Sequence, residues 1–145
     1  MVGNHWLMNK GLMIFSALMI VVADAAATSA AAQDEAYQRR QRDLIALSTV
    51  FGKLHHFRRL CQPGRESQLW RDRMKEVIDY EEPPATTRAA MIKGFNLGFK
   101  AVEKDYQTCN RRVDDLATDE ASRGEAIIAS LKAPLYRTRQ GSNGR

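Results

Sequence analysis

Apolar side chains recur at intervals of three and four residues along much of the chain, and this spacing is typical of one face of an α-helix. The first such row consists of Leu44, Leu47, Phe51 and Leu54. It predicts a helix over about residues 35–60. Pro63 and Gly64 follow in the segment CQPGRES, and because both residues commonly mark turns, we expect the helix to end before them.

Three further helices are predicted by the same criterion, over about residues 66–80, 87–109 and 118–131. The most regular apolar row belongs to the third helix and consists of Met91, Phe95, Phe99, Val102, Tyr106 and Cys109. Thr87 is a suitable N-cap for that helix. No run shows the alternation of paired strands, and short connections favour antiparallel neighbours. The sequence therefore predicts an all-α fold, a small up-down-up-down helical bundle.

The N-terminal segment has the three parts of a secretory signal peptide. Lys10 precedes thirteen uncharged residues, 11–23, and a stretch of small residues follows them. Ala30 and Ala32 fit the two small-residue positions of a cleavage site, so cleavage is predicted between Ala32 and Gln33, with cleavage after Ala27 or Ala30 as the alternatives. The mature protein is therefore expected to be exported.

A retained membrane anchor is the alternative interpretation of the same segment. A spanning helix needs about 20 apolar residues, and a run of that length would include Asp24, at a cost of about 2.5–3.5 kcal/mol near the helix centre. We therefore expect no stable membrane anchor after cleavage. The predicted organisation is a signal peptide (1–32), a helical domain (33–133) and a disordered basic tail (134–145).

The chain carries a formal net charge of +5, and removal of the signal peptide leaves it unchanged because Lys10 and Asp24 cancel. The basic residues are dispersed, and most of them have acidic neighbours. Proteins that bind nucleic acid usually carry a denser basic stripe, so no nucleic-acid partner is predicted. A solvated surface of mixed charge is the favoured interpretation, and weak contact with anionic envelope surfaces is the alternative.

Two cysteines, Cys61 and Cys109, stand 48 positions apart in a chain that is expected to be exported. Thiols of exported proteins are usually oxidised, and the predicted topology places both cysteines at the same end of the bundle. A single structural disulfide between them is therefore predicted. A free reactive thiol and a bridge to another chain stay open, whereas the absence of a C-x-x-C pair disfavours redox catalysis.

Two adjacent histidines, His55 and His56, raise the question of a metal site. Neighbouring side chains on a helix point about 100° apart, and only those three or four positions apart share a face. We therefore predict no metal site, with His55 hydrogen-bonded at the border of the core and His56 facing solvent. No motif of a known catalytic site or cofactor site is present, so no catalytic residue and no cofactor are predicted.

Several short patterns occur together in the chain. They are LSTVFGKLHHFRRLC at residues 47–61, W-R-D-x-M at 70–74, an acid at Glu81, F-N-x-G-F at 95–99 and Y-x-x-C at 106–109. Together they resemble an uncharacterised family, a domain of unknown function, of small exported two-cysteine proteins of Gram-negative bacteria. The resemblance covers about residues 44–109, with a looser match to about 131. It implies a disulfide-bonded helical protein of the periplasm and supplies no reaction.

The chain departs from the family pattern at two positions. The family tends to have an aromatic residue where His56 stands and an arginine where Leu97 stands. The first departure weakens a two-histidine metal site further. The second puts in doubt a site for a charged ligand beside Asn96.

A polar set from three predicted helices is the candidate partner or ligand site. It consists of His55, Arg58, Trp70, Arg71, Glu81 and Asn96. Arg71 or Arg58 could pair with Glu81, and Asn96 could join a buried network with His55. Such a network could instead only fix the register of the helices.

Three functions follow from these observations. The first is a non-enzymatic accessory or interaction protein of the cell envelope, with an envelope protein as its partner. The second is a periplasmic binding module for a small or polymeric anionic ligand. The third is an enzyme that uses His55 with a carboxylate such as Glu81, which requires both groups within hydrogen-bond reach in an open cleft.

Overall fold

The computed structural model describes residues 8–66 and 68–140, and the side chains of residues 31–65 and 68–132. The described chain contains helices and no strand, so the predicted all-α fold is confirmed. The helices are α1 (Met8–Cys61), α2 (Pro63–Glu66), α3 (Leu69–Glu81), α4 (Ala85–Glu103) and α5 (Arg111–Gln140). The predicted break after the first helix coincides with α2, which is a single turn.

The chain divides into two compact units, Met1–Gln38 and Arg39–Arg145. The first unit contains the N-terminal part of α1, and the predicted signal peptide lies almost entirely outside the residues whose side chains are described. Its cleavage therefore stays a prediction. The predicted tail, residues 134–145, also lies outside the described side chains. No helix in the described part of the chain is long and apolar enough to cross a membrane.

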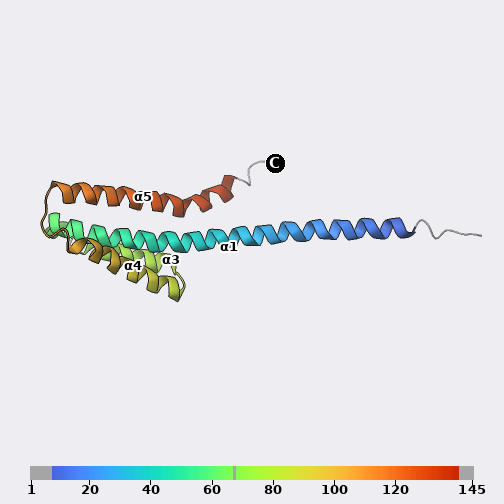
Figure 1. The fold of residues 1–145 in the computed structure, drawn as a ribbon, viewed down its shortest axis with the longest axis horizontal. Coiled ribbons are helices and arrows are strands. Elements are labelled where there is room, and N and C mark those ends of the chain that lie inside the picture. The colour runs from blue at the N-terminus through green and yellow to red at the C-terminus, as the bar shows by residue number, and fades with distance from the viewer. Residues whose placement is uncertain (1–7, 67, 141–145) are drawn as a thin grey trace, which may run out of the picture. The chain divides into compact units, whose positions relative to one another are not determined.

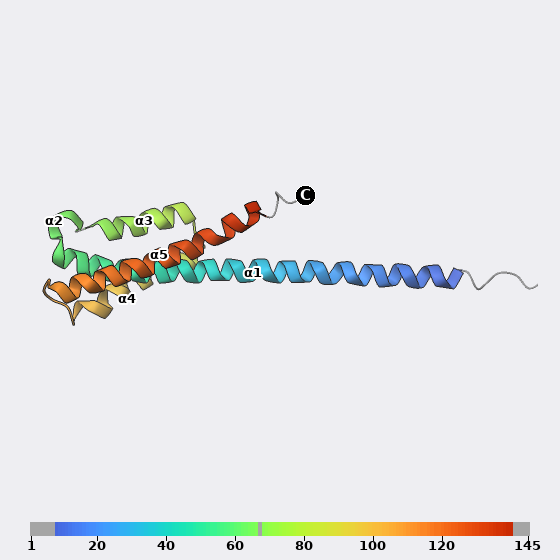
Figure 2. The same cartoon turned by 90° about the horizontal axis from the view of Figure 1, so that it is seen from above.

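The second unit is the helical bundle. The C-terminal part of α1 runs through it, and α3, α4 and α5 lie along this part of α1 (Figures 1 and 2). The chain reverses direction from α1 to α3, from α3 to α4 and from α4 to α5 (Figure 1). The predicted up-down-up-down topology is therefore correct.

The core of the bundle has two apolar clusters. The first contains Leu44, Leu47, Phe51, Met74, Ile78, Met91 and Phe95. The second contains Val50, Leu54, Phe57, Val102, Val113 and Ala117. Both clusters draw on the apolar face of α1 that the sequence pattern predicts. Since each fully buried large apolar side chain contributes about 1.5–3 kcal/mol, this face is a main source of stability.

α1 and α4 approach each other closely because glycines face each other across their interface. A Cβ atom on Gly52 of α1 would lie 2.0 Å from the backbone oxygen of Phe95, and one on Gly98 of α4 would lie 2.1 Å from that of Thr49. Any larger side chain would force the two helices apart. The close contact therefore depends on glycine at both positions.

Several helix boundaries differ from the predicted ones, most clearly those on either side of the α4–α5 connection. α4 ends at Glu103 and α5 begins at Arg111, so Tyr106 and Cys109 lie in the connection between the helices. The amide side chain of Asn110 explains the early start of α5, because its Oδ1 accepts a hydrogen bond from the backbone N–H of Val113 at 3.1 Å. The third predicted helix was therefore too long and the fourth too short.

The predicted N-cap at Thr87 is also wrong. α4 begins at Ala85, and Pro84 precedes it without a side-chain cap. A proline preceding the first turn suits a helix start, since the earliest backbone N–H groups have no partner within the helix. Thr87 lies inside α4 and is buried.

Candidate functional site

A disulfide joins Cys61, at the end of α1, to Cys109, in the connection between α4 and α5. The two Cα atoms are 5.0 Å apart. The predicted pairing is confirmed, and no free cysteine is present. The bridge holds the α4–α5 connection against the end of α1, at the end of the bundle where His56 also lies.

The imidazole of His55 lies in the core and not at its border. The residue is 1% exposed, and its ring lies 5.6 Å from the ring of Phe95 and 5.8 Å from that of Phe99, between centroids. Neither ring nitrogen has a hydrogen-bond partner among the described residues, so the predicted hydrogen bond and the predicted network with Asn96 are wrong. Burial lowers the pKa of His55, and the positive charges of Arg71 and Arg59 lower it further.

His56 is buried at 6% exposure, so the prediction that it faces solvent is wrong. Its Nε2 lies 2.6 Å from the backbone oxygen of Tyr106, to which a protonated Nε2 donates. Its ring meets that of Phe99 edge-on at 5.3 Å. His56 thus attaches the α4–α5 connection to α1, and the length of that connection, which the sequence did not indicate, explains the error.

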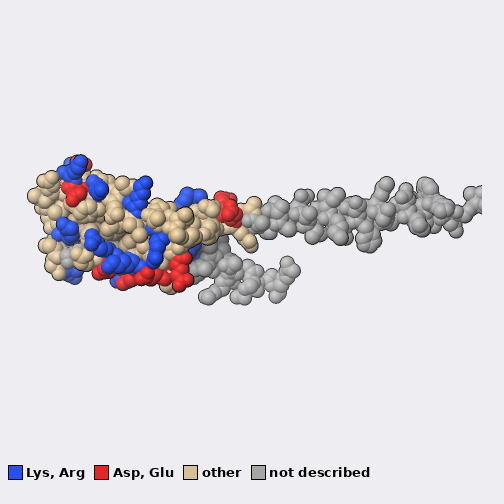
Figure 3. Space-filling view, turned by 90° about the horizontal axis from the view of Figure 1, so that it is seen from below, with Lys and Arg blue, Asp and Glu red and all other residues tan. Residues whose placement is uncertain are grey.

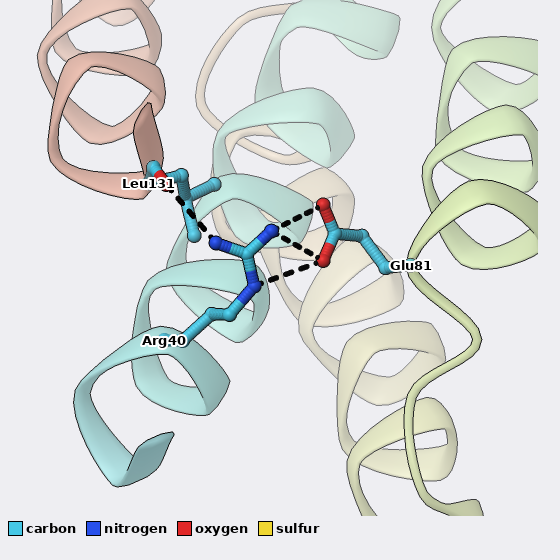
Figure 4. Close-up of polar contacts among 3 residues, drawn as sticks. All are labelled: Arg40, Glu81 and Leu131. Carbon is cyan, nitrogen blue, oxygen red and sulfur yellow. Dashed lines mark hydrogen bonds and ion pairs between the residues drawn. The ribbon is translucent and has the colours of Figure 1, made fainter. Parts of the chain in front are cut away.

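The carboxylate of Glu81 pairs with Arg40, and not with Arg71 or Arg58 as predicted (Figure 4). The guanidinium of Arg40 contacts both carboxylate oxygens, with Nη2 2.8 Å from Oε1 and 2.7 Å from Oε2. Its Nη1 donates to the backbone oxygen of Leu131 at 3.0 Å. Sequence analysis missed Arg40, although its place four residues before Leu44, on the buried face of α1, was a usable signal.

Two further members of the predicted polar set, Arg58 of α1 and Trp70 of α3, also have contacts within the bundle. Arg58 lies 3.4 Å from the carboxylate of Asp114 on α5. The indole of Trp70 packs against Phe51, with ring centroids 5.5 Å apart. Both side chains therefore serve contacts between helices.

Among the described residues, no group of three or more histidine, cysteine, aspartate or glutamate side chains could hold a metal ion. His55 and Glu81 do not form an acid–base pair, because His55 has no hydrogen-bond partner and Glu81 pairs with Arg40. The arrangement proposed for an enzyme is therefore not formed by these two residues.

Several grooves open on the described part of the bundle, and two of them contain residues of the predicted polar set. The α1–α3–α5 groove has a volume of about 560 Å³, and the Arg40–Glu81 ion pair is part of its lining. Its apolar lining consists of Leu44, Leu47, Phe51, Val77, Ile128 and Leu131. Of the predicted polar set it contains only Glu81.

The α3–α4 groove has a volume of about 510 Å³. Its apolar lining consists of Met74, Ile78, Ile92 and Phe95, and its polar lining of Arg71, Lys75, Asp79, Arg88 and Asn96. It brings together Arg71 and Asn96, two members of the predicted set that lie on different helices. The remaining four members lie elsewhere, so the set is not one site.

Some of the charged side chains around the α3–α4 groove form ion pairs within the chain and others do not. Lys75 lies 3.0 Å from Asp72 and Arg88 lies 3.6 Å from Asp79. Arg71 makes no hydrogen bond or ion pair with any described residue. Figure 3 views the bundle from the side on which α3 and α4 lie in Figure 1, and basic and acidic side chains alternate along one edge of it. Of the cations that line this groove, Arg71 is thus the one without an ion-pair partner among the described residues.

These observations define the class of protein: a disulfide-bonded, all-α bundle with an amphipathic groove between two of its helices. The chain belongs to the family described as "Protein of unknown function (DUF2385)", whose family model matches residues 37–134. The matched segment contains the C-terminal part of α1, all of α2, α3 and α4, and most of α5. No curated protein and no solved structure matches the chain.

Proposed function

We propose that this is an exported, non-enzymatic interaction protein of the cell envelope that binds a partner protein in the α3–α4 groove. The observation that carries the proposal is the combination found there. Four apolar side chains lie together with the uncommitted guanidinium of Arg71 and the amide of Asn96. Interfaces between proteins commonly combine an apolar centre with a polar rim in this way.

Two features support a role other than catalysis. The imidazole of His55 lies between two phenyl rings. It has no hydrogen-bond partner among the described residues through which it could exchange a proton with a substrate. The carboxylate of Glu81 is engaged by Arg40 in a contact between helices. Export is supported by the signal-like pattern of the N-terminal segment, and sequencing the N-terminus of the mature protein tests it, with Gln33 as the expected first residue.

A second candidate is a binding module for a small anionic ligand, which Arg71 favours because its charge has no partner among the described residues. Affinity for such a ligand would fall with salt. Binding of wall fragments without capture of any protein would favour this candidate.

Site-specific photo-crosslinking in intact cells tests the proposed function. A photoreactive side chain replaces Ile92, which lines the groove and is 50% exposed. The matched control replaces Leu97, which is 54% exposed on the same helix and does not line the groove. The expected result is one envelope protein captured from position 92 and absent from position 97. Equal capture from both positions would contradict the proposal.

A further inference from the structure

The floor of the α3–α4 groove is built from two helices. Met74 and Ile78 of α3 and Phe95 of α4 are largely buried, while Ile92 is half exposed. Because a half-exposed isoleucine in a concave surface still has apolar area to bury, an apolar side chain of a partner would gain free energy there. The groove is therefore suited to apolar side chains and not to a small inorganic ion alone.

The rim of the groove has more positive than negative charge. Arg71, Lys75 and Arg88 line it, against one acid, Asp79. Two of the three cations have carboxylate partners within this chain, at 3.0 Å and 3.6 Å. Arg71 has none among the described residues, so its charge is available to a ligand.

Arg71 and Asn96 line the groove from opposite helices. A guanidinium presents paired N–H donors that match the two oxygens of a carboxylate. A carboxamide both donates and accepts, which suits the amide groups of a peptide backbone. The two side chains thus provide recognition for an acidic side chain and for the backbone that carries it.

We propose that the α3–α4 groove binds an acidic amphipathic peptide segment of the partner protein. Apolar side chains of the segment cover Ile92 and the buried floor, and one of its carboxylates binds Arg71. This inference rests on the proposed function and names the chemistry of the partner. Charge complementarity selects this occupant over a basic segment, which the positive charge of Arg71 would repel.

The pKa of His55 in the core provides a second measurement of the binding of an acidic segment to Arg71. The positive charge of Arg71 is one of the causes that lower the pKa of His55, after burial and together with Arg59 and His56. A carboxylate bound to Arg71 offsets that charge, whereas the burial and the other two contributions stay in place. The pKa of His55 should therefore rise when an acidic segment binds.

The test uses the mature, disulfide-bonded protein and two synthetic helical peptides. One peptide consists of leucine and alanine with glutamate along its flanks, and the other has glutamine in place of every glutamate. We expect the acidic peptide to bind about tenfold more tightly, because one of its carboxylates forms a charge-assisted hydrogen-bonded pair with Arg71 that the glutamine peptide cannot form. The affinity for the acidic peptide should also fall as salt is raised.

Arg71→Ala should remove this difference, and Arg71→Lys should restore part of it. Arg73→Ala is the matched control, because Arg73 lies on the same helix, pairs with Glu76 and does not line the groove. In NMR titrations, the acidic peptide should raise the pKa of His55 and the glutamine peptide should not. Both arginines are on the surface, so circular dichroism should show an unchanged fold in these variants.

Equal affinity for the two peptides, or no binding of either, would overturn the inference. Binding of anionic phosphatidylglycerol vesicles that is lost on Arg71→Ala, without peptide binding, would overturn it in favour of a lipid surface. The proposed function and the acidic-segment proposal can be refuted separately. Capture from position 92 that survives Arg71→Ala in the crosslinking experiment refutes the acidic segment and keeps a partner protein, whereas peptide binding without any captured protein refutes the partner in the cell.

Discussion

Arg40 of α1 and Glu81 of α3 form a two-pronged ion pair, with Nε 3.0 Å and Nη2 2.7 Å from the same carboxylate oxygen. The remaining nitrogen of Arg40 donates to the backbone oxygen of Leu131 on α5. One guanidinium therefore joins three helices (Figure 4), and Arg40 and Glu81 both line the α1–α3–α5 groove. The side chain of Glu81 is 15% exposed, so its charge is costly to leave without a partner.

Arg40→Met should lower the free energy of unfolding by about 1–2 kcal/mol, because it leaves the largely buried carboxylate of Glu81 without its ion-pair partner. Arg73→Met is the control, since the Arg73–Glu76 pair is exposed and such pairs contribute about 0–1 kcal/mol. Urea unfolding followed by circular dichroism measures both. The double variant Arg40→Met with Glu81→Leu should recover most of the loss. A double variant as unstable as Arg40→Met would show that the ion pair is not the cause.

The close approach of α1 and α4 gives a second prediction. Gly52→Ala places a methyl group against the backbone oxygen of Phe95, and the helices must separate. The free energy of unfolding should fall by on the order of 3 kcal/mol, at the upper end of overpacking effects. Gly64→Ala is the control, because a Cβ there meets nothing within 4 Å. It should be neutral or slightly stabilising in thermal unfolding, and equal losses for the two variants would contradict the close contact.

The disulfide gives a third prediction. Replacing Cys61 and Cys109 together with serine removes a cross-link between positions 48 apart. The chain-entropy estimate for a loop of that length is about 4 kcal/mol, a large share of the about 5–15 kcal/mol that a small domain possesses. Thermal unfolding of the oxidised protein and the double variant measures the difference. A double variant with an unchanged melting temperature would mean that the bridge has no structural role.

The apolar face of α1, the helix order and the cysteine pairing could be predicted from the sequence because each depends on local spacing or on chain reversal at short connections. The partners of polar side chains could not. Glu81 had several arginines within plausible reach, and which one lies opposite depends on how α1 and α3 align. His56 is likewise buried by the α4–α5 connection and not by its own helix. Contacts of this kind are decided by tertiary packing.

The α3–α4 groove, which Arg71 and Asn96 both line, is another feature that could not be predicted from the sequence. Both residues stood out in the sequence, but their proximity depends on α3 and α4 lying side by side. His55 stood out beside them and proved to be a core residue. Gly52 did not stand out at all, because its importance lies in the backbone of another helix.

The buried imidazole of His55 gives the last prediction, on pH. Its folded-state pKa is lowered below the ordinary value of 6.5, so the unfolded chain binds the proton more readily than the folded one. The contribution of the neutral ring to the free energy of unfolding is therefore fully present above about pH 6.5. It is lost as the pH falls from there through the lowered folded-state pKa, and the loss is at most about 1.4 kcal/mol per pH unit. Chemical unfolding at a series of pH values measures this slope.

His55→Leu should remove this slope, because leucine suits the apolar site between Phe95 and Phe99 and carries no proton. At pH 7.5 the variant should be as stable as the native chain or more stable, since the imidazole nitrogens have no hydrogen bonds to lose. His56→Leu is the contrasting variant, because it removes the contact with the Tyr106 backbone oxygen and should be less stable at every pH. If the acid-side slope persisted unchanged in His55→Leu, another group would have to carry it, and the neutral, unpartnered state assigned to His55 would be wrong.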